Sequence, residues 1–343
     1  MFKSALTRGV QRKESARWFR FSLRTLLITV SCVSLSMVLL SYRIGKVKWA
    51  LQQIEREGGG VWYQNDVGEE MPFKVSNTNW LRISVGLESL PIVSIIEFFK
   101  FSRDHFENET PRENTSMISR NTLQKISVFP SVSGLKFYKA RLHPEDLIYL
   151  EGLTNLKVLQ FRCSSNARGH DLSQLDSLGK LRSLQHLTIT DLPDVRGQLG
   201  FLRKLKSLQD LEIRAETLGT ESLEIIGTLT QLEGLLISNI LVGDSGLTHL
   251  ADLKELRYLN LGKAPVAPNS IVQLEKLKKL RYLAICPTAI DDTLVTALKH
   301  FENLQYLDLS CEVVADELRL LQDSLPNCSV NEVGINTNDG IAD

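Results

Sequence analysis

Three tyrosines recur at a fixed spacing in the C-terminal half of the chain. Tyr258, Tyr282 and Tyr306 are 24 residues apart, and each directly precedes a leucine. Aromatic and arginine side chains dominate protein recognition surfaces, and amide and carboxylate groups add hydrogen bonds. We predict that these tyrosines and their polar neighbours bind a protein, peptide or glycan; the neighbours are Arg257, Arg281, Asn260 and Asp308. The alternative is that the tyrosines only stack and stabilise a sheet.

Catalytic chemistry has little support in the sequence. The six histidines are dispersed, at His105, His143, His170, His186, His249 and His300, and no HExxH, GxSxG or nucleotide fingerprint occurs. Of these, only His186 is expected near the tyrosine surface. Asp191 and Asp194 suit a cation site, but solvated loop carboxylates are the simpler interpretation. We therefore predict no enzyme, no catalytic residue, no metal and no cofactor.

The cysteines give no metal-binding or redox motif. None of the five belongs to a CxxC pair. Cys32 lies in an apolar run, and the other four are interpreted as small buried hydrophobic residues, at Cys163, Cys286, Cys311 and Cys328. Whether these four form disulfides stays open.

The tyrosines belong to a sequence repeat. Seven segments of the form Leu-x-x-Leu-x-(Leu, Ile or Phe) begin at Leu156, Leu184, Leu208, Leu232, Leu256, Leu280 and Leu304. The first spacing is 28 residues and the next five are 24. A weaker copy begins at Leu135, with Tyr138 and Ala140. A second apolar triplet, such as Leu247, Leu250 and Leu253, follows each segment at helical spacing, so each repeat predicts a strand and then a helix.

This double period resembles the leucine-rich-repeat family in its 24-residue form. The resemblance implies an α/β fold: a right-handed leucine-rich-repeat solenoid (horseshoe) with a parallel sheet and convex helices, used for binding. We place this domain at 135–330, followed by a disordered tail at 331–343. The four extra residues of the long repeat are expected in a loop at 164–170. At the turn position where the family usually has Asn, Cys or Thr, this chain has residues of several types, so no continuous ladder of side-chain hydrogen bonds is expected. These residues are Ser164, Leu192, Glu216, Ile240, Ala264, Thr288 and Glu312.

An uncharged apolar segment lies near the N-terminus. It covers residues 25–42, from Thr25 to Tyr42, and as a helix it would extend about 27 Å, close to the hydrocarbon thickness of a bilayer. We predict a transmembrane helix; a cleaved signal peptide and a buried core helix are the alternatives. Seven basic residues precede it, so residues 1–24 are expected in the cytoplasm and the repeats outside, at the cell (inner) membrane. The stretch 17–27 and the anchor resemble bacterial single-pass membrane members of the family.

The region between the anchor and the repeats is less regular. Residues 43–60 are predicted to form a helical stalk that ends at Gly58–Gly60, and 61–134 an N-terminal cap or irregular region. Within the cap, 61–63 predicts a strand, 80–85 and 92–101 predict strand or helix, and 102–122 predicts a loop. Leu123, Ile126 and Val128 are expected to start a degenerate repeat.

Charge distribution limits the possible partners. Residues 1–48 hold ten Lys and Arg against one acidic residue, so the rest of the chain is acidic and unsuited to nucleic acid. The leading hypothesis is a membrane-anchored, non-catalytic interaction protein. The alternatives are a self-associating structural envelope protein and an enzyme with its site in 61–134.

Overall fold

The structure is a computed structural model. It describes residues 31–32, 34–35, 42, 45–46, 49–50, 52, 54, 59–64, 70–73, 92–98, 116–127, 129, 132–163, 172–195, 197–240 and 246–332. The chain divides into two units, Met1–Lys46 and Val47–Asp343. In the first unit the described residues are helical, but most of the predicted transmembrane segment 25–42, and all of 1–24, lie outside them. Among the described residues, no helix has the length and apolar character needed to cross a membrane.

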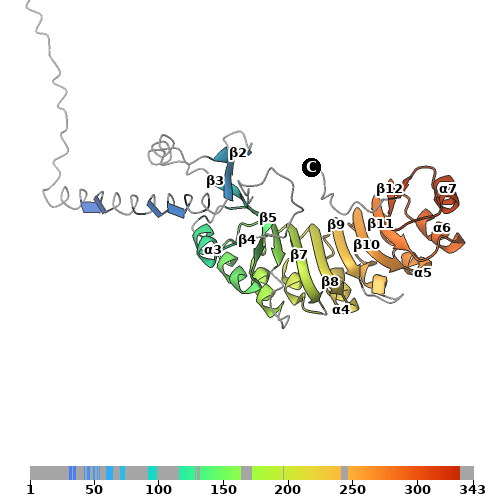
Figure 1. Cartoon of the computed structure of the whole chain (residues 1–343), viewed down its shortest axis with the longest axis horizontal. Coiled ribbons are helices and arrows are strands. Elements are labelled where there is room, and N and C mark those ends of the chain that lie inside the picture. Colours follow the sequence, from blue (N-terminus) through green and yellow to red (C-terminus); the bar gives the residue numbers. More distant parts are fainter. Residues whose placement is uncertain are drawn as a thin grey trace, which may run out of the picture. The chain divides into compact units, whose positions relative to one another are not determined.

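The second unit is built on one sheet, shown in Figure 1. Its strands are β1 (Gly59–Gln64), β2 (Glu70–Phe73), β3 (Ile92–Phe98), β4 (Ser116–Met117), β5 (Gly134–Leu142), β6 (Val158–Cys163), β7 (His186–Val195), β8 (Asp210–Leu218), β9 (Gly234–Ile240), β10 (Tyr258–Val266), β11 (Tyr282–Pro287), β12 (Tyr306–Leu309) and β13 (Ser329–Glu332). Strand β3 and strands β5 to β13 run parallel in chain order, and β1 pairs antiparallel with β2 and β3. The predicted parallel sheet is therefore confirmed.

Helices follow the strands along one side of the sheet, as Figure 1 shows. They are α3 (Arg120–Ile126), η1 (Pro144–Leu150), η2 (Leu172–Lys180), η3 (Gly200–Lys204), α4 (Thr220–Gly227), η4 (Gly246–Leu250), α5 (Pro268–Val272), α6 (Asp292–Lys299) and α7 (Ala315–Ser324). The η elements are 3₁₀-helices. The apolar triplets recur every three residues, a spacing that matches the three residues per turn of a 3₁₀-helix and also fits one face of an α-helix.

The core lies between the sheet and these helices. All three apolar positions of the seven repeats are at most 6% exposed. Successive side chains of a strand point to opposite faces, so the residues between the leucines lie on the face away from the helices. We call this the concave face, and it comprises the first and third residues of strands β6 to β12. Burial of each leucine contributes about 1.5–3 kcal/mol.

The first repeat differs from its prediction. Leu135 pairs with Leu159, so Leu135 is the second apolar position of its repeat and not the first. The first position is Val132, which is fully buried and lies 24 residues before Leu156. The predicted frame with Tyr138 and Ala140 is therefore wrong by three residues. The frame was misassigned because Tyr138 lies three residues after Leu135, which is the spacing between the first and second apolar positions of a repeat.

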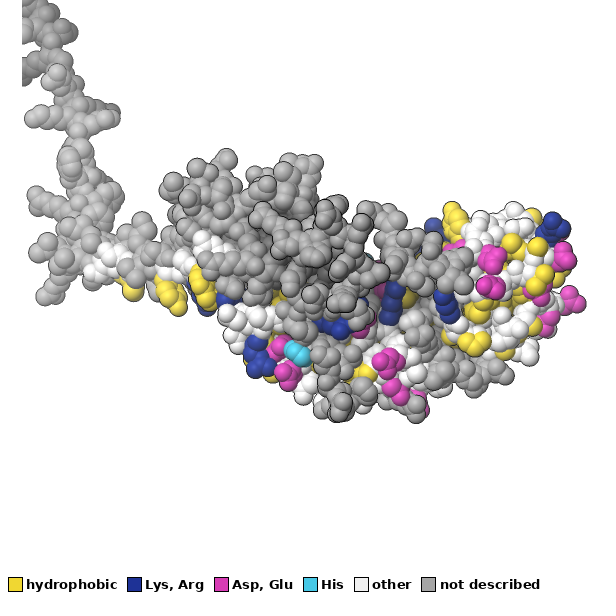
Figure 2. Space-filling model, viewed as in Figure 1, with side chains coloured by type: hydrophobic (Ala, Val, Ile, Leu, Met, Phe, Trp, Pro, Cys, Tyr) yellow, Lys and Arg dark blue, Asp and Glu magenta, His cyan; other side chains and the backbone are white. Residues whose placement is uncertain are grey.

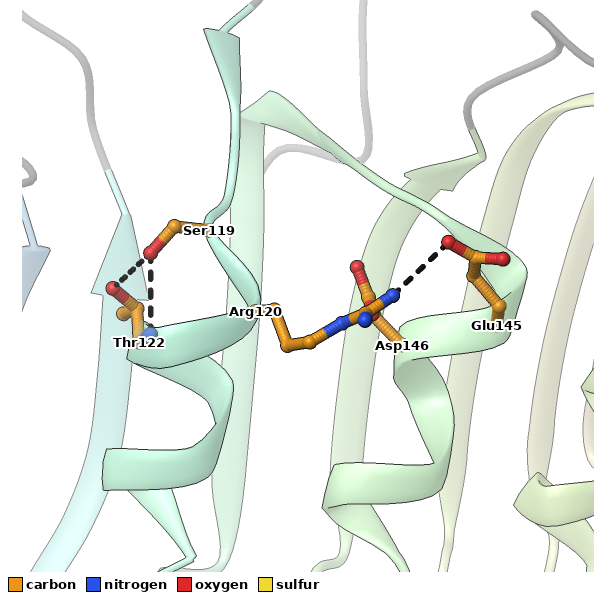
Figure 3. Close-up of polar contacts among 5 residues, drawn as sticks. All are labelled: Ser119, Arg120, Thr122, Glu145 and Asp146. Carbon is orange, nitrogen blue, oxygen red and sulfur yellow. Dashed lines mark hydrogen bonds and ion pairs between the residues drawn. The ribbon is translucent and has the colours of Figure 1, made fainter.

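An earlier repeat is present, as the sequence predicts. Leu123 and Ile126 are buried on α3, and Phe129 completes a triplet before Val132; Val128 is outside the described residues. Ser119 caps α3 by accepting the Thr122 N–H at 3.2 Å. Arg120 of the same helix reaches η1 and forms ion pairs with Glu145 and Asp146 (Figure 3). Helix α3 thus packs as the convex helix of a repeat.

The N-terminal cap extends the sheet. The strand expected at 61–63 is confirmed as β1, and β3 resolves the ambiguity at 92–101 in favour of a strand. Residues 80–85 and 102–115 lie outside the described residues. The loop predicted at 102–122 is wrong at its C-terminal end, where β4 and the first residues of α3 lie. The helical stalk residues Ala50 and Ile54 are buried, and the Trp49 ring centroid lies 3.9 Å from Lys125 Nζ on α3. Lys125 is only 3% exposed, so the stalk covers the start of the repeats.

The other end and the turns complete the solenoid. Strand β13 continues through Asn331 and Glu332, which the predicted boundary at 330 assigns to the tail; residues 333–343 and the predicted loop 164–170 lie outside the described residues. A backbone ladder joins successive repeats at the start of their strands. Seven carbonyls each accept two N–H groups of the next repeat at 2.7–3.0 Å; they belong to Ser133, Lys157, Gln185, Gln209, Glu233, Arg257 and Arg281.

Candidate concave interface

The predicted tyrosines occupy one row on the concave face. In the parallel register, Tyr258 of β10 pairs with Tyr282 of β11, which pairs with Tyr306 of β12. The first two rings are stacked, with centroids 4.3 Å apart and planes at 6°. Tyr306 is 51% exposed. The expected placement of all three on one open face is therefore confirmed, because neighbouring strands lie about 4.8 Å apart and bring equivalent side chains together.

Polar groups next to the row hold the rings in place. The Tyr282 hydroxyl donates to Asp308 Oδ2 at 2.5 Å, and Asn331 Nδ2 donates to Asp308 Oδ1 at 3.2 Å. Asn260 Nδ2 lies 3.4 Å from the Tyr258 hydroxyl, to which it donates. Burial, followed by the hydrogen bond to Asp308, raises the pKa of Tyr282 above its usual value. Its hydroxyl therefore stays protonated and keeps its role as a donor.

The two predicted arginines lie one residue before the tyrosines. Arg257 forms an ion pair with Glu233 of the preceding repeat, with 3.1 Å between Nε and Oε2. Arg281 is exposed. Exposed ion pairs contribute about 1 kcal/mol or less, so Arg257 can exchange Glu233 for a ligand carboxylate at small cost.

A hollow of about 290 Å³ adjoins the tyrosine row, and it was not predicted from the sequence. Its lining comes from strands β7 to β10: His186, Leu187, Thr188, Asp210, Leu211, Glu212, Gly234, Leu235, Leu236 and Tyr258. At its centre, Gly234 occupies the position that tyrosine fills in the next three strands. A glycine at a strand position that faces outward was the available signal, because such a glycine leaves space for a ligand.

Polar side chains border this hollow. His186 Nδ1 lies 2.7 Å from Asp210 Oδ2 on the adjacent strand. Arg214 pairs with Glu212 at 2.6 Å between Nε and Oε1. The expected position of His186 near the tyrosine surface is therefore confirmed, since both His186 and Tyr258 line the same hollow.

Comparison with known proteins agrees with this architecture. The family model described as leucine-rich repeat region matches residues 137–338, more than half of the chain. The chain belongs to the leucine-rich-repeat family. No curated protein matches its sequence.

Solved structures similar to this leucine-rich-repeat chain come from plants and bacteria. The ectodomain of the Arabidopsis receptor kinase HAESA, solved with an IDA peptide hormone, is 15% identical with a TM-score of 0.39, over 57% of this chain and 32% of that one. An internalin of Listeria monocytogenes is 16% identical with a TM-score of 0.36, over 64% and 85%. A leucine-rich-repeat protein of Leptospira interrogans is 15% identical with a TM-score of 0.24, over 63% and 81%. The chain spans about a third of the plant ectodomain, and at these identities the likeness concerns the fold alone.

Carboxylates of the leucine-rich-repeat chain that were considered for a cation have protein partners. Asp191, at φ 59°, accepts from Arg162 Nε at 2.9 Å and from Arg141 Nη2 at 3.4 Å. Asp194 accepts from the Thr217 hydroxyl. Across the ranges described above, no group of three or more His, Cys, Asp or Glu side chains is arranged to hold a metal ion.

The cysteines of the leucine-rich-repeat domain differ in burial. Cys163 is buried, as predicted, and burial raises its pKa to about 11. Cys286, Cys311 and Cys328 are only partly buried, so the prediction of buried residues is wrong for these three, which lie near the ends of the C-terminal strands. Burial and a hydrogen bond with the Cys286 thiol raise the pKa of Cys311 to about 12.

Proposed function

We propose that this leucine-rich-repeat protein is a non-catalytic interaction protein whose concave face binds a protein or peptide. The observation that carries the proposal is the stacked pair of Tyr258 and Tyr282 beside the half-exposed Tyr306. Rigid aromatic groups lose little conformational entropy on binding and suit the centre of an interface. The exposed Arg281 adds a charged group at the edge of this row.

Anchoring to a membrane is the second part of the proposal. It is supported by the 18 uncharged residues from Thr25 to Tyr42 and by the seven basic residues before them. In this arrangement the N-terminus lies in the cytoplasm and the solenoid outside the inner membrane. Such a solenoid presents its concave face to ligands in the extracytoplasmic space.

Site-specific photo-crosslinking in cells tests the concave face. A photoreactive phenylalanine analogue replaces Tyr306 in the full chain, and in a matched variant it replaces Lys276, an exposed residue between α5 and β11 on the helix side. We expect a discrete adduct from position 306 and none from 276. The double substitution Tyr258→Ser and Tyr282→Ser should remove the adduct while the protein level is unchanged. Equal adducts from both positions would contradict the proposal, as would an adduct that survives the double substitution.

Protease accessibility tests the anchoring, and the mass of the crosslinked adduct tests self-association. If the solenoid is outside, a protease added to intact cells or spheroplasts removes it, whereas a domain cut only after lysis contradicts the orientation. Figure 2 shows hydrophobic and acidic side chains together over the C-terminal end, where Val314 and Leu320 are 66% and 43% exposed. This patch favours self-association as the second candidate function. Self-association would give a crosslinked dimer with twice the chain mass of 38.6 kDa.

A further inference from the structure

The hollow over Gly234 is a gap in a row of side chains. In register across the sheet, this row runs His186, Asp210, Gly234, Tyr258 and Tyr282. The strands of Asp210 and Tyr258 flank β9, so their backbones lie about 10 Å apart. A volume of about 290 Å³ is at the lower limit of small-ligand pockets and suits one side chain of a larger partner.

The two walls of the gap differ in chemistry. Tyr282 covers one face of the Tyr258 ring at 4.3 Å, so the other face is directed across Gly234. On the opposite wall, Asp210 uses Oδ2 for His186, while its Oδ1 leans over Gly234 and would overlap a Cβ placed there. The gap therefore has an aromatic face on one side and a carboxylate oxygen on the other.

This pair of walls selects a flat cation. The face of an aromatic ring attracts positive charge, and a guanidinium group stacks on it while donating hydrogen bonds in its own plane. A carboxylate strengthens those bonds because both partners are charged. A neutral aromatic side chain would gain the stacking but leave Asp210 without a donor on that side. The other carboxylate of the lining, Glu212, is already paired with Arg214.

We infer that the hollow over Gly234 binds an arginine side chain of the partner. The guanidinium lies above Asp210 Oδ1, against the face of Tyr258 that Tyr282 leaves open, so it continues the stack of Tyr282 and Tyr258 and donates to Asp210 Oδ1. This inference rests on the proposed function, because it names the chemistry of one partner residue at the concave face.

Binding of amino-acid amides to the full purified chain tests the inference. The probes are the N-acetyl amides of arginine, citrulline, lysine and tyrosine, with binding followed by saturation-transfer NMR. Citrulline has nearly the shape of arginine without its charge. We expect arginine to bind about tenfold more tightly than citrulline, and more tightly than lysine or tyrosine. Equal affinities for arginine and citrulline, or a preference for lysine or tyrosine, would overturn the inference.

Matched variants locate the probe. Asp210→Asn keeps the shape of the hollow and should weaken arginine binding about tenfold. Asp252→Asn removes an exposed carboxylate from the helix side and should leave binding unchanged. If Asp210→Asn leaves the affinity for the arginine amide unchanged, the guanidinium binds elsewhere and the inference is overturned.

The two proposals fail separately. If crosslinking at position 306 succeeds while no amide prefers the hollow, the inference is wrong and the concave interface stands. If arginine binds through Asp210 while position 306 gives no partner adduct, the proposed function is wrong and only a side-chain site remains.

Discussion

Two glycines of consecutive repeats lie on opposite sides of the sheet. Gly227 ends α4 on the helix side, where a Cβ would overlap the backbone carbonyl of His249 in the next repeat. Gly234 begins β9 on the concave face, where a Cβ would overlap only the carboxylate end of Asp210. A backbone carbonyl in a packed solenoid cannot move aside, whereas an exposed carboxylate can rotate. The first glycine is thus required by the scaffold, and the second reflects the composition of a surface.

The same contrast holds within each strand. The apolar positions are almost fully buried in all seven repeats, and their chemistry hardly varies. The first concave position varies from Val158 through Asp210 and Gly234 to Tyr306 on the same backbone. The repeated residues therefore specify the fold, and information about a ligand resides in the positions that break the repeat.

The largest expected effect comes from the buried side of a strand. Leu259→Ala deletes a fully buried side chain and should lower the free energy of unfolding by about 2–5 kcal/mol. Its neighbour Tyr258 faces the other way, so Tyr258→Ser should lose mainly the ring stacking, about 0.5–1.5 kcal/mol. Urea unfolding followed by circular dichroism measures both. A larger loss for Tyr258→Ser than for Leu259→Ala would contradict the division between scaffold and surface.

The two glycines provide the next test. Gly227→Ala forces the α4 segment away from His249 and should lower the free energy of unfolding by about 1–3 kcal/mol, the usual range for overpacking. Gly234 is buried beneath the carboxylate of Asp210, which can rotate away, so Gly234→Ala should lower this free energy by less than Gly227→Ala does, about 1 kcal/mol or less. Thermal and urea unfolding of the two variants compare the same chemical change on opposite sides. Similar losses would mean that the concave face is as constrained as the helix side.

These differences explain which features the sequence could predict. The leucine spacing predicted the sheet, the helices and the tyrosine row, because a strand alternates its faces strictly and neighbouring repeats stack in register. The frame of β5 was missed because Tyr138 imitates a repeat position. The antiparallel pairing of β1 with β2 and β3 has no periodicity to reveal it. The hollow was missed because it depends on an absent side chain at Gly234 and on the rotamer of Asp210, neither of which leaves a spacing pattern.

A smaller loss than those of Leu259→Ala and Gly227→Ala is expected when one hydroxyl of the tyrosine row is removed. Tyr282→Phe keeps the ring stack but removes the hydrogen bond to Asp308. Asp308 keeps the donor from Asn331, so it is not left unpaired. We therefore expect a loss of about 0.5–1.5 kcal/mol near neutral pH, typical of a single hydrogen bond. Tyr306→Phe is the matched control, since it removes a hydroxyl from the exposed ring of the same row.

The pH dependence identifies this hydroxyl more specifically. The pKa of Tyr282 is raised in the folded protein by burial and by Asp308, whereas in the unfolded chain it is about 10. Below that pH the hydroxyl is protonated in both states, and its contribution to stability is complete. Above it the unfolded chain ionises first, so stability falls as pH rises toward the folded pKa. Urea unfolding between about pH 9 and 11 should show a shallower decline for Tyr282→Phe than for the unaltered chain and Tyr306→Phe. Identical slopes in all three proteins would contradict this prediction. They would mean that the Tyr282 hydroxyl has the same pKa in the folded and the unfolded protein, and that Asp308 does not stabilise its protonated form.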